Sequence, residues 1–442
     1  MRLRNISKSI HAALFVAGIA PVIALGQAPS GSTPVVTLPE ARRRAAVVDP
    51  DAVAARSRVY TASWERRTAF ANLVTPRLRG GVSYLHFSEP FFNFGTATIS
   101  PNATSATLEA SYVLLGAGKL GTLGSSRASL ASAEANEDAA SYRTAFATDA
   151  AYFAVLADRE LARVASDRLK RAEEQFGIAR VRVLAGEAIA SDSLQLLLEV
   201  NRARLGILSR DSALVTSRLR LGSQIGLPGP AEATPMDTAL PPPLPMTQEE
   251  AAEEVRRRGP DVEAARADER RADALVSAER EKYLPEITLG ALTGAYDKEL
   301  FPSATRRSQV TVTVSLPFWD GGQRELSAAR LQADRNVARA RRAERERSAA
   351  QLVAQAYNGY VTARAGIELA SVGVAVSSEN YRVQRARYRE GATTILDLME
   401  AQVAVSEAEA TLVQSRFATW LALAQIESLL GRRVFETSAA QD

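Results

Sequence analysis

The sequence predicts a mainly helical protein with a membrane β-barrel, built from long antiparallel helical hairpins and four β-strands per chain. Two long stretches without proline repeat apolar residues every three or four positions, as an amphipathic helix does. Two pairs of short segments alternate polar and apolar residues, which is typical of half-buried strands. This order of helices and strands occurs in both halves of the chain. With 442 residues, 46% of them hydrophobic, the chain can bury a sizeable core.

The two predicted helical stretches are unusually long. The first runs from about 126 to 183 and would measure roughly 90 Å. The second runs from about 324 to 389 and would measure roughly 100 Å, whereas a compact domain of this size is only about 40 Å across. We therefore expect an elongated molecule. The residues that set the helical spacing of the second stretch are Leu326, Ala329, Ala333, Val337 and Ala340.

The clearest predicted strand is the segment 309–316, in which polar and apolar residues alternate over the whole length. Its apolar side chains point to one face, and this face requires a second sheet or lipid. The segments 78–86, 106–114 and 287–296 alternate in corresponding places, and the aromatic segment from Phe87 onward is predicted to be an external loop. The side chains predicted to face the membrane are those of Val310, Val312, Val314 and Leu316.

The two halves of the chain match each other when the second is shifted by about 205 to 210 positions. Proline, glycine and aspartate residues then coincide in the same order along the chain. Such a repeat predicts two copies of one structural unit, each with a helix, two strands and a long helical hairpin. The matching pairs include Pro50 with Pro260, Gly118 with Gly322, Gly186 with Gly391, Asp192 with Asp397, and Gly226 with Gly431.

The repeat also sets the expected domain boundaries. Between the two units lies a proline-rich segment, and its prolines lack the N–H that a helix interior needs, so it is expected to run extended. The predicted units are the first repeat at 29–226, an inter-repeat strap at 227–247, the second repeat at 248–435 and a C-terminal tail at 436–442.

The first 28 residues have the pattern of a secretory signal peptide. Arg2, Arg4 and Lys8 precede an apolar run at 12–25, which is short for a spanning helix and is followed by small residues. A retained membrane anchor is the alternative. Without these three basic residues, the 54 lysines and arginines fall to 51, against 50 acidic residues. The mature chain therefore has no basic excess that would predict a nucleic-acid partner.

The composition argues against an enzyme. The chain has no cysteine and two histidines, of which His11 lies in the predicted signal and His86 stands alone. Thiolate metal sites, a cysteine nucleophile and serine–histidine catalysis therefore lack their usual residues. No glycine-rich phosphate loop is present either, so we expect no cofactor and no metal.

Four strands cannot close a membrane barrel alone, because the smallest such barrels have about eight. Unpaired backbone groups in lipid are costly, so several copies of the chain must complete the barrel. Two copies would give a barrel filled by side chains, and three would leave an open lumen. Phe318, Trp319 and Tyr296 are spaced like aromatic residues at a membrane interface, with packing at a strand–helix junction as the alternative.

Two segments resemble the TolC-like outer-membrane efflux protein family. Residues 316–324, Leu-Pro-Phe-Trp-Asp-Gly-Gly-Gln-Arg, are similar to the family's strand-to-helix junction, and 388–402 are similar to its helical hairpin end. Weaker versions occur at 114–119 and 183–192. The resemblance implies a homotrimer with a 12-stranded barrel in the outer membrane, continued by a periplasmic α-barrel of long helices.

The resemblance also implies residues for a periplasmic gate. Asp397 and Glu400 would form an acidic ring at the closed aperture, with Tyr388 as a latch residue and Asp192 as the corresponding acid of the first repeat. Capping is the alternative for Asp397, because Thr394 precedes it by three positions. In the first repeat, Val183 stands in place of the tyrosine and Gln195 in place of Glu400, so a gate contribution from that hairpin is less well supported.

By the same resemblance, the chain would be the exit duct of a tripartite efflux or type I secretion system. It would pass substrates from an inner-membrane pump and a periplasmic adaptor to the outside, and a periplasmic coiled-coil adaptor is the alternative. The sequence does not select drugs, metal ions or polypeptides as cargo. The residues expected to contact the adaptor are Gly186, Glu187, Gly391, Ala392 and Thr393.

Overall fold

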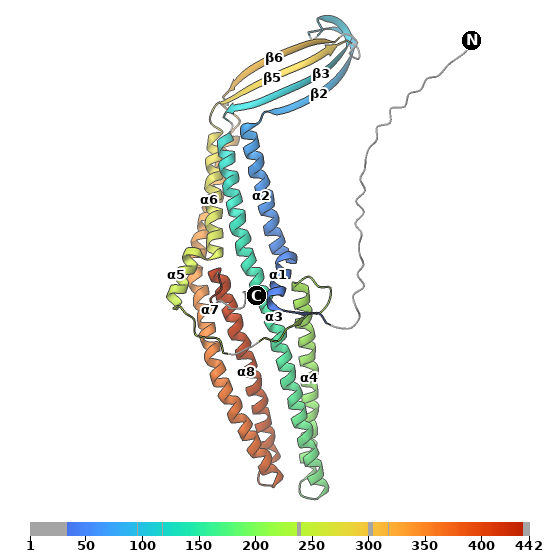
Figure 1. Ribbon diagram of the computed structural model, residues 1–442, viewed down its shortest axis with the longest axis vertical. Helices are drawn as coiled ribbons and strands as arrows, with labels where there is room; N and C mark the ends of the chain where they lie inside the picture. Colours follow the sequence, from blue (N-terminus) through green and yellow to red (C-terminus); the bar gives the residue numbers. More distant parts are fainter. Residues whose placement is uncertain are drawn as a thin grey trace, which may run out of the picture.

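A computed structural model describes residues 33–94, 96–116, 118–236, 240–298, 304–316 and 318–435. The predicted signal peptide at 1–28 and the predicted C-terminal tail at 436–442 lie outside these residues. The molecule is a long rod of helices with a curved sheet at one end and two helical hairpin turns at the other (Figure 1). The predicted elongated shape is confirmed.

Helices form most of the rod, and the longest are longer than predicted. Helix α3 extends the first predicted stretch at its start by seven residues, because it begins directly after the left-handed Gly118. Prolines open α2 and α6 in the two halves, where their missing N–H costs no helical bond. The helices are α1 (Leu38–Val48), α2 (Pro50–Val74), α3 (Lys119–Leu184), α4 (Ala190–Gln224), α5 (Gln248–Arg258), α6 (Pro260–Glu281), α7 (Gln323–Arg389) and α8 (Ile395–Leu430).

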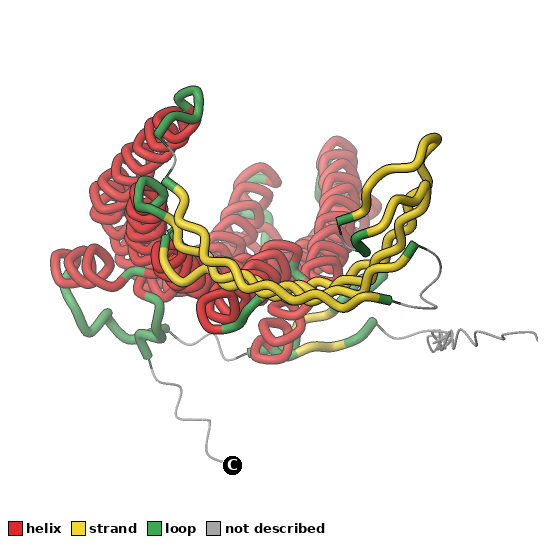
Figure 2. The backbone as a smooth tube through the Cα atoms, turned by 90° about the horizontal axis from the view of Figure 1, so that it is seen from above, coloured by secondary structure: helices red, strands yellow, loops and turns green. Residues whose placement is uncertain are grey.

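One four-stranded antiparallel sheet caps the rod, with strand order β2-β3-β5-β6. Figure 2 shows the sheet curved into an arc. The strands are longer than the alternation predicted. The prediction of a loop from Phe87 onward is wrong, because Phe91 pairs with Ser100 beyond an irregularity in the ladder. The strands are β2 (Arg77–Asn93), β3 (Thr98–Leu115), β5 (Glu286–Asp297) and β6 (Thr305–Ser315).

A second, two-stranded sheet was not predicted. Strand β1 (Val35–Val36) pairs in parallel with β4 (Glu232–Ala233), which lies in the segment between the two repeats. The count of four strands therefore holds for the large sheet only. Tyr152 and Arg159 of α3 donate hydrogen bonds to carbonyls of this inter-repeat segment, at 2.9 and 3.2 Å. These contacts fasten the segment across the middle of the rod.

The hydrophobic core lies between the packed helices and extends along the rod. Helix α3 packs on α2 and α6 near the sheet and on α4 and α8 toward the turns, while α7 packs on α6 and then α8. Apolar side chains fill the middle around Tyr152, Leu156 and Leu221, and a separate cluster around Tyr388 and Leu398 fills the turn end. The residues that set the predicted helical spacing of the second stretch are exposed in the single chain, and the buried positions of α7 begin further along, at Ala349 and Val353. The exposed residues are Leu326, Ala329, Ala333, Val337 and Ala340. Among the described helices, none has the length and apolarity that crossing a bilayer would require.

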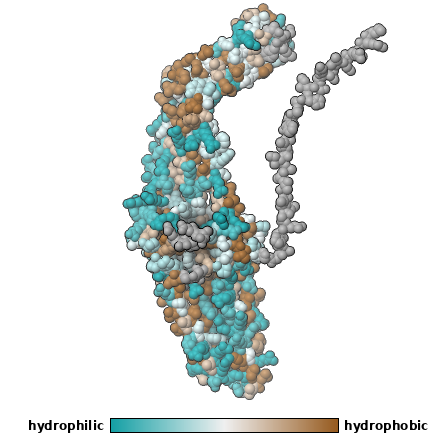
Figure 3. Space-filling model, in the orientation of Figure 1, coloured by the Kyte–Doolittle hydropathy of each residue, from teal (hydrophilic) through white to brown (hydrophobic). Residues whose placement is uncertain are grey.

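The two faces of the large sheet differ in polarity. Directly paired residues share a face, so Leu289 and Val312 lie together on one face and Gln309 and Leu292 on the other. All four predicted membrane-facing residues are exposed, and Figure 3 shows hydrophobic residues gathered over the sheet where it meets the helices. Tyr296 lies on the opposite face, paired with Ser105, so its prediction as an aromatic at the lipid interface is wrong.

Candidate functional site

The two hairpin turns share one backbone conformation. We call residues 182–192 the first tip and residues 387–400 the second tip. Each has a glycine with a left-handed φ, 75° at Gly186 and 74° at Gly391, which an L side chain rarely adopts. Each turn is closed by an amide that donates to a carbonyl five residues earlier. These bonds run from Glu187 to Arg182 at 2.9 Å and from Ala392 to Arg387 at 2.8 Å.

The second tip contains a complete capping box. The Thr394 hydroxyl accepts from the Asp397 amide at 3.3 Å, and the Asp397 carboxylate accepts from the Thr394 amide at 3.0 Å. Thr393 donates to the same carboxylate at 2.9 Å. Hydrogen bonds from the two threonine side chains hold the pKa of Asp397 below its usual value. The capping alternative is therefore present in the structure, and an acidic-ring role needs further copies of the chain.

The other acidic residues of the tips are placed differently. Glu400 lies one turn beyond Asp397, is exposed, and has no hydrogen bond or ion pair within the described part of the chain. Asp192 is half-buried, and its charge contributes to raising the pKa of Tyr388. Glu187 lies on the outside of the first tip, with its carboxylate 3.7 Å from Arg182. Of the predicted gate carboxylates, Glu400 is thus the one that is free to face an aperture.

Tyr388 is a buried residue that joins the tips, with only 2% of its surface exposed. The Arg182 guanidinium stands 5.0 Å from the centroid of its ring and donates to its backbone carbonyl. Burial raises the pKa of Tyr388 above its ordinary value, and the hydroxyl has no hydrogen-bond partner among the residues that the structure describes. Arg182 could not be identified from the sequence, because its partner Tyr388 lies 206 residues away.

A row of polar contacts continues from this arginine along the seam between the two hairpins. Arg171 binds the Glu409 carboxylate with both terminal nitrogens, at 3.3 and 2.9 Å. The fully buried Gln175 donates to the Tyr381 hydroxyl at 3.0 Å. Arg385 pairs with Glu174 at 3.0 Å. Side chains of α3 therefore hold α7 and α8 through specific contacts over several helical turns.

Both tips expose large aliphatic side chains. Leu184 and Ile189 flank the first turn, and Leu396 follows the second turn. They surround the predicted adaptor-contact residues, of which Gly186, Glu187, Gly391 and Ala392 are exposed and Thr393 is half-buried. The sequence also assigned the flanking segments 183–190 and 389–395 to adaptor contact, which include Leu184 and Ile189 but not Leu396. Such a surface can bind another apolar surface.

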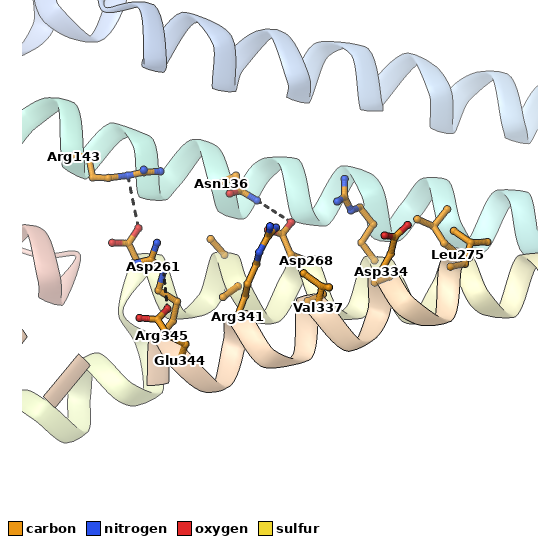
Figure 4. A pocket seen from close by; sticks show the side chains of 16 residues that line it. Asn136, Arg143, Asp261, Asp268, Leu275, Asp334, Val337, Arg341, Glu344 and Arg345 are labelled. Atoms are coloured by element: carbon orange, nitrogen blue, oxygen red, sulfur yellow. Dashed lines mark hydrogen bonds and ion pairs between the residues drawn. The ribbon is translucent and has the colours of Figure 1, made fainter. Parts of the chain in front are cut away.

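A polar cavity of about 550 Å³ lies between α3, α6 and α7, closer to the sheet (Figure 4). Asp268 accepts from Ser132 at 2.6 Å and from Asn136 at 3.2 Å, and Arg143 lies 3.7 Å from Asp261. Acidic and basic side chains alternate along its walls. Within the part of the chain that the structure describes, no group of three or more acidic or histidine side chains could hold a metal ion.

These features define a class of protein, namely a subunit with an open, curved four-stranded sheet mounted on long helical hairpins. The fold matches solved outer-membrane channels. The structure of CusC aligns with a TM-score of 0.77 at 17% identity, covering 89% of this chain and 92% of that one. The structure of VceC from Vibrio cholerae aligns with a TM-score of 0.75 at 18% identity, covering 90% and 97%.

Sequence comparison gives the same relationship. Residues 251–432 match the family model described as outer membrane efflux protein. TtgC, a probable efflux pump outer membrane protein of Pseudomonas putida, is 24% identical over 65% of this chain. CzcC, a cobalt-zinc-cadmium resistance protein of Cupriavidus metallidurans, is 27% identical over 64% of this chain and 66% of its own length. The matched region spans 60% of the length of TtgC. The second half of this chain is therefore similar to outer membrane efflux proteins, and the fold of the chain matches theirs.

Proposed function

We propose that three copies of this chain form an exit duct that crosses the outer membrane and extends into the periplasm. Their sheets would close a 12-stranded β-barrel, and their helices would form a continuous α-barrel below it. The repeats at 29–226 and 248–435 would each give two strands and one hairpin, joined by the strap at 227–247. The duct has no catalytic role in this proposal. The signal peptide at 1–28 would direct its export.

The observation that carries this proposal is the pair of open edges on the large sheet. Strand β2 leaves the helices at Arg77, and β6 returns to them at Ser315, so the two edge strands run in opposite directions. Their unpaired backbone groups can therefore pair with those of another copy and continue the antiparallel order. With one apolar face, such a sheet is stable in lipid only when it closes, because lipid offers no partner for an open edge.

The helical layer has matching open edges. Toward the tips, α4 packs on α3 and α7 packs on α8, which leaves one side of α4 and of α7 uncovered. Exposed apolar residues recur on both sides at spacings of three, four or seven, which is the pattern of a coiled-coil seam. These stripes favour pairing of α4 with α7 of the next copy. They comprise Leu194, Leu198, Leu205, Leu208, Val215 and Leu219 on α4, and Leu369, Val372, Val376 and Val383 on α7.

The tips would form the periplasmic entrance. In a trimer, Asp397 and Glu400 would supply six carboxylates around a narrow opening, which would favour the passage of cations. Arg182 would hold the second tip of each copy in its closed position through Tyr388. The exposed aliphatic residues and the turns at Gly186 and Gly391 would receive a periplasmic adaptor that leads to an inner-membrane pump.

A periplasmic adaptor or scaffold is the second candidate. Long helical hairpins fit it, but a four-stranded amphipathic sheet with two open edges does not. Fractionation without detergent separates the two candidates, because a duct stays with the outer membrane and an adaptor enters the soluble fraction. The relatives are named for antibiotic efflux, toluene efflux and cobalt-zinc-cadmium resistance, so the cargo would be selected by the pump and not by the duct.

Single-channel recording in a planar bilayer tests the duct directly. We expect the purified wild-type chain to conduct with a preference for cations. The double variant Asp397→Ala, Glu400→Ala should conduct more and lose part of that preference, because the acidic opening is removed. Equal conductance and selectivity in both proteins would refute the acidic ring, and the absence of any conductance in membrane-inserted wild type would refute the duct.

A further inference from the structure

A shallow depression lies on the apolar face of the large sheet, away from the helices. Its volume is about 560 Å³. Gly80, Ala106 and Ala295 form its low centre, since their side chains are absent or short, and Val82 and Leu108 form higher walls. The strand pairing places all five positions on the same face of the sheet as the valines of β6, which is the face that carries Val310. A hydrocarbon chain would fit such a surface.

Arg306 lies at the edge of this depression. It pairs directly with Ala295, and this register places its side chain on the apolar face. It is exposed and makes no hydrogen bond or ion pair with any residue that the structure describes. Its neighbour Arg307 pairs with Gly294 and points to the polar face. An unpaired guanidinium on an apolar face requires an anion or water close to it.

The position of Arg306 along the strand indicates which anion this is. The valines of the apolar face end at Val310, and Arg306 lies four residues further from the helices, roughly 13 Å at the rise of a strand. In the proposed barrel, the helices mark the periplasmic side, so Arg306 lies toward the outer surface of the membrane. Arginine on a lipid-facing strand is tolerated there, where headgroups begin, and strongly disfavoured at the midplane.

We propose that this depression binds one phosphate-bearing lipid of the outer leaflet in each copy of the chain. The phosphate would accept hydrogen bonds from Arg306, whose planar guanidinium matches phosphate oxygens in pairs. One acyl chain would lie in the hollow over Ala106 and Ala295, between Val82 and Leu108. This inference rests on the proposed barrel, because it requires the apolar face to meet lipid. The proposal goes beyond the barrel because it predicts a selective site for one kind of lipid on a surface that would otherwise contact any acyl chain.

The test measures lipid binding to the intact assembly in a neutral detergent by native mass spectrometry. The probe is lipid A with both phosphates, compared with the same lipid after removal of both phosphates. Arg306→Gln removes the charge, and Arg307→Gln is the matched control, because it removes the same charge one residue away on the other face. Ala295→Trp fills the hollow and keeps the arginine.

We expect wild type and Arg307→Gln to bind the phosphorylated lipid equally, and Arg306→Gln to bind it about tenfold more weakly. The dephosphorylated lipid should bind wild type and Arg306→Gln alike, and Ala295→Trp should weaken both lipids. Equal binding of the phosphorylated lipid by wild type and Arg306→Gln would overturn the proposal. Full displacement of the lipid by millimolar inorganic phosphate would also overturn it, because the hollow would then contribute nothing.

Bilayer conductance of the same wild-type preparation separates this inference from the proposed function. A preparation that conducts but binds lipid without regard to Arg306 refutes the lipid site and leaves the duct intact. A preparation that never enters membranes refutes both.

Discussion

The first and second tips have the same backbone and different side-chain chemistry. Both end a helix of more than sixty residues with a left-handed glycine and a bond back over five residues. The second tip then begins α8 with the Thr394–Asp397 capping box, whereas the first begins α4 at Ile189 with no side-chain cap. The repeat has therefore kept the fold of the turn and changed its charges and caps.

This difference gives the two tips separate roles. The first tip supplies Arg182, which reaches the second tip, and the second supplies the buried ring and the carboxylates around it. Neither tip alone contains the contact between the hairpins. A motion that separates the hairpins must break this contact, so the four predictions below change side chains of the tips and of the adjoining seam.

Removing Arg182 should have the largest effect. Arg182→Ala deletes the hydrogen bond to the Tyr388 carbonyl and the contact with its ring, so the hairpins lose their connection at the tips. Because a hydrogen bond to a charged group contributes about 1.5–3 kcal/mol, we expect the open probability in bilayer recordings to rise about tenfold or more. Arg180→Ala is the control, since Arg180 is exposed and has no ion pair among the described residues. An equal rise in both variants would contradict a specific role for Arg182.

The helix N-cap can be removed from the second tip and introduced into the first. Thr394→Ala should lower the free energy of unfolding by about 1 kcal/mol per chain, as loss of a helix N-cap does. Ile189→Thr should raise it by a similar amount, because Asp192 stands three residues later and completes the same box. Chemical denaturation of both variants measures the change. If Ile189→Thr stabilises nothing, the difference between the tips does not come from capping.

The capping box should also make stability depend on pH. The pKa of Asp397 is lowered in the folded chain, so its contribution is fully present above the unfolded pKa of about 3.9 and is lost as pH falls through the lower folded value. The effect therefore lies below about pH 4. Wild type should lose stability there faster than Thr394→Ala, whose carboxylate has fewer hydrogen bonds to lose.

Tyr388, one of the buried tyrosines of α7, should show the smallest effect on substitution, and Tyr381 provides the control. Tyr388→Phe removes a hydroxyl that has no hydrogen-bond partner in the described part of the chain, so the free energy of unfolding should change little. Tyr381→Phe removes the acceptor of the buried Gln175 amide and should cost about 1–3 kcal/mol. Thermal unfolding of the two variants compares them. A large loss in Tyr388→Phe would mean that its hydroxyl has a partner in the assembly.

Much of the fold could be predicted because its signals are local. Pro50 and Pro260 mark the starts of corresponding helices, and the alternation around Val312 marks a strand. The Thr394–Asp397 box is readable from four residues. Phe87 was misassigned because the strand continues through pairing with β3, which depends on residues beyond any local window.

The contact between the hairpins could not be predicted for the same reason. Arg182 and Tyr388 belong to different repeats, and only the packing of α3 against α7 and α8 brings them together. An arginine near a helix C-terminus ordinarily interacts with its own helix end, so its sequence context indicates nothing more. The proposed gate carboxylates depend on family resemblance, while the residue that couples the two hairpins required the structure.

The opposed directions of β2 and β6 have a consequence for stoichiometry. Because either edge accepts the other from any neighbouring copy, hydrogen bonding between strands would join two, three or four copies equally well. The number of subunits would then be set by the angle between neighbouring protomers, which depends on how strongly the sheet and helices of each protomer curve around the barrel axis. A substitution that flattens this turn would widen the ring or leave it as an open ribbon, without breaking a single strand pair.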